Sequence, residues 1–155
     1  MDMETFAQRV ESLRPKLYRT AICYLGSEAA ALDALDEAVY RGLKSLKKLR
    51  QPEFFDTWMT RILLNECSRE RKRRGRFRPL EEVKELTQED YDDLPLQEAI
   101  EKLPKELKDI VILRFFSGYT QAETAEALDI PQGTVATRQR KALQLLKLDL
   151  EEASV

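Results

Sequence analysis

The sequence predicts an all-α protein built from two small helical domains that a flexible acidic linker joins. Apolar residues recur every three or four positions along most of the chain, which is the spacing of one helix face. No stretch shows the sustained polar and apolar alternation of a strand, and no Asn-Gly or Asp-Gly hairpin turn occurs. A segment with little periodicity and many acids interrupts the pattern at residues 76–94. We therefore expect one domain over residues 1–75 and another over 95–150.

The first domain is expected to begin with two long helices. The apolar face of the first helix consists of Phe6, Val10, Leu13, Leu17, Ala21 and Tyr24. Gly26-Ser27 should then stop this helix and cap the next, because glycine tolerates the backbone of a helix end and serine accepts a hydrogen bond at a helix start. The apolar positions of the second helix, which should end near Leu49, are Leu32, Leu35, Val39, Leu43 and Leu46.

A break at Arg50-Gln51-Pro52 separates the second helix from a third, because proline is tolerated only in the first turn of a helix. The apolar stripe of the third helix is Phe55, Trp58, Met59, Ile62 and Leu63. The helix runs into a basic stretch, since seven of the ten residues from Arg69 to Arg78 are Lys or Arg, whereas residues 81–93 contain seven acids and one Lys. The local electrostatic field of each segment therefore says more about its binding partners than the net charge of −2 does.

The second domain is expected to contain four helices, of which the first is short. Its apolar face is Leu96, Ile100 and Leu103. A helix that starts at Pro104 and stops at Gly118 should bury Leu107, Ile110, Val111 and Phe115. The last two helices are predicted from Thr120 to Leu128 and from Gln132 to about Leu148, with the tight connection Asp129-Ile130-Pro131 between them.

These last two helices have the organisation of a helix-turn-helix. Ala125 is small where two helices must cross closely, and the wedge that sets their angle is expected at Leu128, Ile130 and Val135. Asp129 stands in the turn, where it adopts a left-handed backbone more easily than most residues do. An inward face of Val135, Ala142, Leu143 and Leu146 would leave the polar and basic side chains of the second helix to a major groove and its phosphates.

Composition limits the chemistry and the location of the chain. It contains no histidine, the commonest general base and transition-metal ligand, so we expect no enzyme, no metal and no cofactor. Cys23 and Cys67 lie in apolar helical patterns and are expected to be buried, reduced thiols. No apolar run approaches the roughly 20 residues of a membrane span, and the acidic N-terminus is unlike a signal peptide. We expect a cytoplasmic protein without membrane insertion.

Residues 103–143, LPKELKDIVILRFFSGYTQAETAEALDIPQGTVATRQRKAL, resemble region 4 of the sigma-70 family. The features that match in order and spacing are Leu103-Pro104, Gly118-Tyr119-Thr120, Glu123, Ala125 and Gly133-Thr134-Val135. In the first half, DALDEAVYRGLKSL resembles sigma region 2.2, and FFDTWMTRILLNECSRERKRR resembles regions 2.3 and 2.4. Because regions 1.1 and 3 of housekeeping sigma factors are missing, the resemblance is to the extracytoplasmic-function group.

The resemblance implies an alternative sigma factor that binds core RNA polymerase and directs promoter-specific transcription initiation. The residues that it implies for core polymerase are Asp33, Asp36, Glu37, Tyr40 and Arg41. Those that it implies for the minus-10 element of promoter DNA are Phe54, Trp58, Arg61, Asn65, Arg69, Lys72 and Arg73. Those expected at the minus-35 element are Gln121, Thr134, Thr137, Arg138, Arg140 and Lys141. Members of this group are often held by an anti-sigma factor, which is a further candidate partner.

Several positions depart from the pattern of the family. Ala136 stands where the family usually has Lys or Arg, which removes one expected DNA contact. Arg69 stands where an acid is often found, so the polar arrangement of the third helix should differ. The other departures are Asp36 for Gln, Thr124 for an apolar residue and Gln139 for Leu.

Less specific interpretations stay open for individual features. Trp58 lies in the apolar stripe, so core packing is a stronger expectation for it than base stacking. The charged face of the second helix would be a solvated surface if its pattern stood alone. For the whole chain, the alternatives are a repressor or activator that binds DNA without polymerase, a helical adaptor, and a phosphotransfer or nucleotide-hydrolysing enzyme. The enzyme would need a glycine loop that the five scattered glycines do not form.

Overall fold

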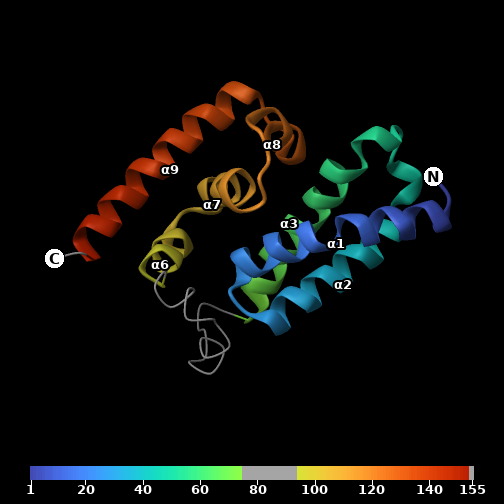
Figure 1. The fold of residues 1–155 in the computed structure, drawn as a ribbon, viewed down its shortest axis with the longest axis horizontal. Coiled ribbons are helices and arrows are strands. Elements are labelled where there is room, and N and C mark those ends of the chain that lie inside the picture. Colours follow the sequence, from blue (N-terminus) through green and yellow to red (C-terminus); the bar gives the residue numbers. More distant parts are fainter. Residues whose placement is uncertain (75–93, 154–155) are drawn as a thin grey trace. The chain divides into compact units, whose positions relative to one another are not determined.

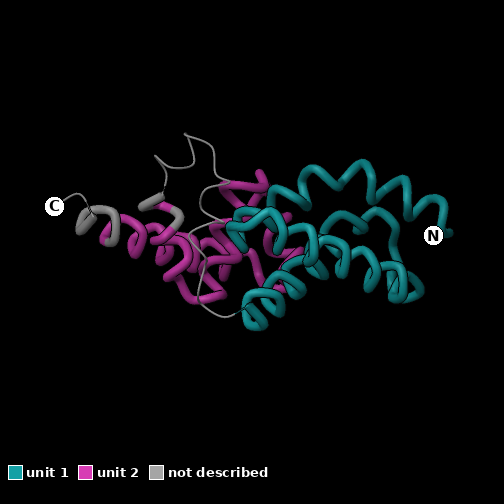
Figure 2. The backbone as a smooth tube through the Cα atoms, turned by 90° about the horizontal axis from the view of Figure 1, so that it is seen from below, with its two compact units in different colours: residues 1–78 teal, residues 79–155 magenta. Residues whose placement is uncertain are grey.

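The structure, a computed structural model, describes residues 1–74 and 94–153. The chain divides into two compact units, Met1–Arg78 and Pro79–Val155 (Figure 1, Figure 2). The regular elements of the described residues are all helical, which confirms the predicted fold class. The acidic linker expected at residues 76–94 lies outside the described residues except for Leu94.

Unit 1 contains three long helices, α1 (Met3–Leu25), α2 (Glu28–Lys44) and α3 (Phe55–Arg74), and each packs against the other two. Two short 3-10 turns, η1 (Leu46–Lys48) and η2 (Pro52–Phe54), connect α2 to α3. The second helix therefore ends before the predicted position. Its last turn tightens after Lys44, and the chain continues through these turns before Pro52 allows a new start.

The corner between α1 and α2 forms as the sequence predicts. Gly26 has a positive φ of 71°, and its N–H donates to the Ile22 carbonyl at 2.7 Å. Ser27 Oγ accepts a hydrogen bond from the Ala30 N–H at 3.2 Å. The left-handed glycine and the serine cap satisfy backbone groups that a helix end leaves without partners.

The core of unit 1 depends on small residues of α2 more than the sequence suggests. The buried residues of this helix are Ala30, Ala31, Ala34, Leu35, Ala38 and Gly42. A Cβ atom at Gly42 would lie 2.9 Å from the Met59 Sδ atom, so α2 and α3 approach each other very closely there. The prediction that Leu32 is buried is wrong, since its side chain is 39% exposed. A close helix contact buries alanine and glycine and moves bulkier side chains to its margin.

Unit 2 consists of α6 (Leu94–Lys102), α7 (Lys105–Val111), the π-helical turn η3 (Ile112–Phe116), α8 (Gln121–Leu128) and α9 (Gln132–Ala153). The long helix α9 packs against α6, α7 and α8. One core cluster of this unit contains Ala99, Ile100, Leu103, Leu107, Val111, Ala142 and Leu146. The predicted apolar faces of α6 and α7 thus meet one side of α9.

The π-helical turn was not predicted, and it changes which side chains are buried. The Ser117 N–H donates to the Ile112 carbonyl at 2.9 Å, which is the five-residue spacing of a π turn. Phe115, predicted to be buried, is 49% exposed. An extra residue in the turn rotates later side chains away from the face that an α-helix would have buried.

The helix-turn-helix is confirmed by the packing of α8 against α9. Ala125 and Val135 are buried in one cluster with Ile110, and the predicted wedge residues Leu128 and Ile130 pack against it. Asp129 is left-handed, with a φ of 57°. On α9 the prediction that Leu143 is buried is wrong, because it is 44% exposed. The residues that point inward are Ala142 and Leu146, and Leu143 is turned by about 100° from Ala142.

Candidate functional site

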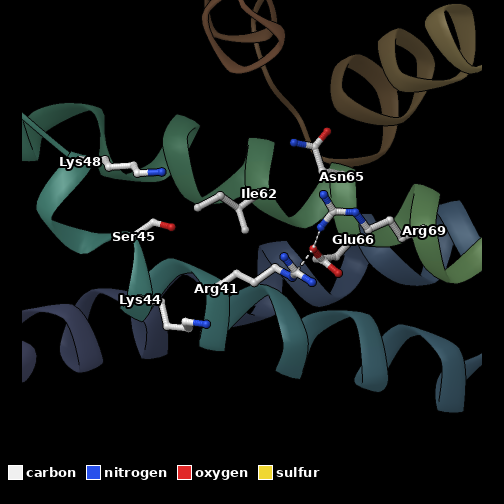
Figure 3. Close-up of a pocket in the computed structure, with 8 residues that line it drawn as sticks. All are labelled: Arg41, Lys44, Ser45, Lys48, Ile62, Asn65, Glu66 and Arg69. Carbon is white, nitrogen blue, oxygen red and sulfur yellow. Dashed lines mark hydrogen bonds and ion pairs between the residues drawn. The ribbon is translucent and has the colours of Figure 1, made fainter.

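A basic pocket lies between α2 and α3 in unit 1 (Figure 3). Its volume is about 440 Å³. The residues of α2, η1 and the position between them that line this α2–α3 pocket are Arg41, Lys44, Ser45 and Lys48. Those of α3 are Ile62, Asn65, Glu66 and Arg69. Four cationic side chains and one carboxylate line the pocket, which therefore suits an anionic ligand.

Glu66 is a buried carboxylate in the wall of this pocket and is 6% exposed. Its Oε1 atom lies 2.7 Å from Arg41 Nε and accepts a hydrogen bond from Arg69 Nη1 at 2.5 Å. Arg41 Nε also lies 3.2 Å from Glu37 Oε1. Figure 3 shows Glu66 between the two guanidinium groups, one from each helix. These bonds offset the desolvation of the carboxylate and tie α2 to α3.

A second buried carboxylate, Glu70, lies one turn further along α3 and is 5% exposed. It pairs with Arg73 and accepts a hydrogen bond from Arg74 Nε at 2.5 Å. Arg74 Nη2 donates in turn to Asp33 Oδ2 on α2 at 2.8 Å. Part of the basic stretch is therefore held in place by acids of both helices.

Neither glutamate was among the predicted site residues, although the sequence contains a signal for both. Met59, Leu63, Glu66 and Glu70 follow one another at spacings of four, three and four residues, which is the buried stripe of a helix. Their position on the apolar stripe predicts burial with cationic partners.

The residues predicted for the minus-10 element separate into three groups in the structure. Asn65 and Arg69 line the α2–α3 pocket. Trp58 is half-buried with its ring 5.9 Å from that of Phe55, whereas Phe54 is 42% exposed at the end of η2. The remaining predicted residues are exposed along α3 and do not line the pocket: Arg61, Lys72 and Arg73. The pocket residues that were not predicted for the minus-10 element are Arg41, which was predicted for core polymerase, and Lys44, Ser45, Lys48, Ile62 and Glu66.

The residues predicted for core polymerase are all exposed on α2. Asp33, Asp36 and Glu37 also form ion pairs, and the Asp36 pair with Arg14 is long, at 3.9 Å. Tyr40 is 55% exposed, and the Lys44 ammonium lies 5.2 Å from its ring. Arg41 differs from the other four because it lines the pocket and bonds to α3.

The residues predicted for the minus-35 element lie on α9 and at the start of α8. Thr137, Arg140 and Lys141 are exposed, and Thr134 and Arg138 are half-buried. Within the described part of the chain, no ion pair engages Arg138, Arg140 or Lys141. The hydroxyl of Thr137 donates to the Gly133 carbonyl at 3.1 Å, so it has an acceptor lone pair left for DNA.

A polar network fixes the approach of the chain to α8. Arg114 donates to the Tyr119 carbonyl at 2.5 Å and to Gln139 Oε1 on α9 at 3.0 Å. Gln121 Nε2 lies 3.5 Å from the same Gln139 oxygen. Thr120 caps α8, since its Oγ1 accepts from the Glu123 N–H and its own N–H donates to Glu123 Oε1, each at 3.0 Å. Gln139, noted as a departure from the family pattern, thus joins α9 to Arg114 by a hydrogen bond.

The described residues contain neither a metal-ligand cluster nor a membrane-spanning helix. Over residues 1–74 and 94–153, no three His, Cys, Asp or Glu side chains are grouped as metal ligands would be. None of the helices that the structure describes is long and apolar enough to cross a membrane.

Comparison with known proteins identifies two family regions. Residues 9–77 match sigma-70 region 2, and residues 93–146 match sigma-70 region 4. RNA polymerase sigma factor SigV of Bacillus subtilis is 30% identical over 138 residues, which cover 86% of this chain and 83% of that protein. The ECF RNA polymerase sigma factor SigW of the same organism is 26% identical, with 97% and 91% of the two chains covered.

Solved structures show the same fold. CnrH, in complex with the cytosolic domain of CnrY, superposes with a TM-score of 0.76 at 21% identity, covering 97% of this chain and 90% of that one. RpoE of Bartonella quintana, in complex with the anti-sigma factor NepR, gives a TM-score of 0.72 at 20% identity, covering 96% and 98%. The paired regions favour a sigma factor over a DNA-binding repressor or an adaptor. The chain belongs to the sigma-70 family, as an extracytoplasmic-function sigma factor that directs RNA polymerase to specific promoters.

Proposed function

We propose that three surfaces of this sigma factor divide the work of initiation. The α2–α3 pocket and the basic end of α3 bind the minus-10 element, the exposed side of α9 binds the minus-35 element, and the acids of α2 dock on core polymerase. The observation that carries the proposal is the composition of the pocket. An apolar side chain, an amide, a hydroxyl and four cations are what a base and its phosphates require.

The minus-10 assignment follows from the chemistry of these side chains. Ile62 offers an apolar surface to a base, and the Asn65 amide can donate to and accept from its edge. Removing a base from the stack costs a few kcal/mol, which phosphate contacts along α3 help to offset. Lys72 and Arg73 are exposed beyond the pocket and are suited to those phosphates. We expect duplex binding to be weak without polymerase.

The minus-35 assignment rests on the helix-turn-helix. The Ile110, Ala125 and Val135 cluster fixes the angle of α9. Arg140 and Lys141 are exposed on this helix, Arg138 is half-buried beside its inward face, and none of the three forms an ion pair with a described residue. Such a helix presents donors to guanine and phosphate oxygens in a major groove. Gln121 at the start of α8 and Thr134 at the start of α9 lie near the turn, where backbone contacts are expected.

The docking surface on α2 can be tested by charge reversal. Changing both Asp33 and Glu37 to Lys would place like charges against a basic partner, which costs several kcal/mol. We expect affinity for core polymerase to fall on the order of 100-fold or more. The measurement is a titration of labelled sigma factor with core polymerase. It is followed by run-off transcription on a genomic fragment library, which also recovers the promoters.

A matched variant controls for net charge. Glu11 and Glu98 are exposed on α1 and α6 and are not part of the proposed α2 face. Changing both to Lys therefore makes the same change in net charge without altering that face. That variant should bind core polymerase as the parent does. Equal affinity of the Asp33 and Glu37 variant, with the melting temperature unchanged, would contradict the docking surface.

The proposal places the chain in the cytoplasm, where promoter DNA and polymerase are found, and gives it no catalytic reaction. We also propose that an inhibitory protein binds it. Support comes from the fold that it shares with CnrH, which was solved in complex with the cytosolic domain of CnrY.

A further inference from the structure

Arg41 and Arg69 come from different helices but share one oxygen of Glu66. Arg41 Nε lies 2.7 Å from it, and Arg69 Nη1 lies 2.5 Å from it. The carboxylate is 7% exposed, whereas the two arginine side chains are 47% and 60% exposed. Glu66 is therefore buried, whereas about half of each arginine side chain that lines the pocket is exposed (Figure 3).

Each guanidinium keeps donors that Glu66 does not use. Arginine has five N–H donors, and the bonds described here engage Nε of Arg41 and Nη1 of Arg69. The planar fork of each arginine matches two oxygens of a phosphate. A single carboxylate between them fixes their separation, so a ligand need not order two long side chains when it binds.

We propose that Glu66 is a positioning residue that holds Arg41 and Arg69 as a pair for one phosphodiester of the unpaired promoter strand. Arg41 then belongs to the DNA site and not to the polymerase face. The inference rests on the proposed minus-10 function of the pocket. It explains how Arg69 can stand where the family often has an acid, because Glu66 supplies a carboxylate one turn earlier.

The position of Arg41 supports this reassignment. Its closest carboxylate is Glu66 on α3, and Glu37 on its own helix lies further away, at 3.2 Å. Lys44, Ser45 and Lys48 continue the same side of the pocket from α2 into η1. The DNA surface thus crosses from α3 onto the end of α2.

Glu70 provides a matched control for Glu66. It lies on the same helix, is equally buried and is also paired with two arginines, but it does not line the pocket. Glu66→Gln and Glu70→Gln make the same change in shape and charge. Only the first should alter a contact inside the pocket.

The experiment uses holoenzyme, assembled from the full chain and core polymerase, and the unpaired minus-10 strand of a promoter recovered by run-off transcription. Each phosphate of the strand is replaced in turn by an uncharged methylphosphonate. For the parent we expect one position where this replacement weakens binding by about tenfold, the loss of a charge-assisted hydrogen bond. In Arg41→Ala, Arg69→Ala and Glu66→Gln the penalty at that position should disappear. The salt slope should fall by about 0.7 for a lost phosphate.

Measurements of core affinity and of four further variants separate the outcomes. Glu70→Gln should keep the penalty at that position, and Arg19→Ala, an exposed arginine of α1, should change nothing. Arg41→Lys keeps the positive charge but removes the forked guanidinium, so it should also lose the binding penalty at that phosphate. This variant replaces Glu66→Gln in the test if Glu66→Gln does not fold. The inference is overturned if Arg41→Ala weakens core binding and leaves the penalty in place. If Asn65→Ala and Arg69→Ala also leave DNA binding unchanged, the minus-10 function itself is wrong.

Discussion

The basic side chains that we propose to contact DNA are held differently in the two units. In unit 1, four arginines proposed for or next to the DNA surface are held by the buried Glu66 and Glu70: Arg41, Arg69, Arg73 and Arg74. In unit 2, the exposed Arg140 and Lys141 form no ion pair with any described residue. Under the proposed function, the basic side chains are therefore held in place where the DNA ligand is a flexible unpaired strand.

A physical reason connects this difference to the two kinds of DNA. An unpaired strand has no fixed shape, so cations that are already in place reduce the entropy lost on binding. Duplex DNA has a regular groove, and a helix at the correct angle places its side chains without further help. Unit 2 accordingly fixes the angle of α9 through its wedge cluster and the Arg114 network.

The largest expected effect comes from the core beneath the unit 1 surface. Phe55 is fully buried, with its ring 5.7 Å from Phe6 and the Arg9 guanidinium 5.0 Å above it. Phe55→Ala should lower the free energy of unfolding of unit 1 by about 3–5 kcal/mol, through lost burial and a cavity. Urea unfolding followed by Trp58 fluorescence measures this, because Trp58 is the single tryptophan of the chain.

The adjacent Phe54 is the control for this prediction. Its side chain is 42% exposed, so Phe54→Ala should change stability by less than about 0.5 kcal/mol. Equal losses for the two variants would show that the described burial is wrong. If hydrogen exchange in α9 accelerates as much as in α3 when Phe55 is removed, the units share their stability and the comparison between them fails.

Much of the fold could be predicted because its corners depend on local chemistry. Gly26 and Ser27 end one helix and start the next, and Asp129 adopts the left-handed turn, all from short-range backbone preferences. The face of α2 could not be predicted in the same way. Its burial depends on how closely α3 approaches Gly42, and this is a property of the packed pair.

The candidate site was only partly predictable for a similar reason. Asn65 and Arg69 were identified from the family pattern of α3, but Lys44, Ser45 and Lys48 come from the end of α2 and from the turn η1 that follows it. Their meeting in one pocket depends on the early end of α2 and on the turn η1. A one-dimensional pattern contains neither fact.

A smaller effect is expected on α9, where it sharpens the contrast with unit 1. Arg138 is half-buried in the half of the helix that we propose to enter the groove, and Lys141 is exposed. Arg138→Ala should relax preference at one or two minus-35 positions, since a bidentate contact to guanine is worth about 1–3 kcal/mol of discrimination. Lys141→Ala should weaken binding to all promoter variants about equally, because an ammonium group contacts phosphate as a point charge.

The measurement is transcription by reconstituted holoenzyme on every single-base variant of the minus-35 element. Gln144→Ala, an exposed change on the same helix, is the control and should leave the profile of preferences unchanged. If Arg138→Ala lowers transcription from all minus-35 variants by the same factor, Arg138 contacts the DNA backbone and not a base. The base contact would then be sought at Thr137, Arg140 or Gln121.

The smallest predicted effect compares the helix caps of the two units. Thr120→Ala should lower the free energy of unfolding by about 1 kcal/mol, and Thr120→Ser should restore it. The helix that it caps, α8, has eight residues, so the loss of its first turn disturbs the wedge at Ala125. Asp2 caps the 23-residue α1, whose buried face starts only at Phe6, so Asp2→Ala should fray one turn with a smaller loss.

Acid titration distinguishes the Asp2 cap further. The Thr5 hydrogen bonds lower the pKa of the Asp2 carboxyl below its ordinary value of 3.8. A lowered folded pKa means that the contribution of the cap is present above 3.8 and is lost as the pH falls through the folded value. The melting temperatures of the parent and of Asp2→Ala should therefore differ near neutral pH and converge in strong acid. A difference that persists after the carboxyl is protonated would mean that Asp2 stabilises α1 by packing and not by its charged cap.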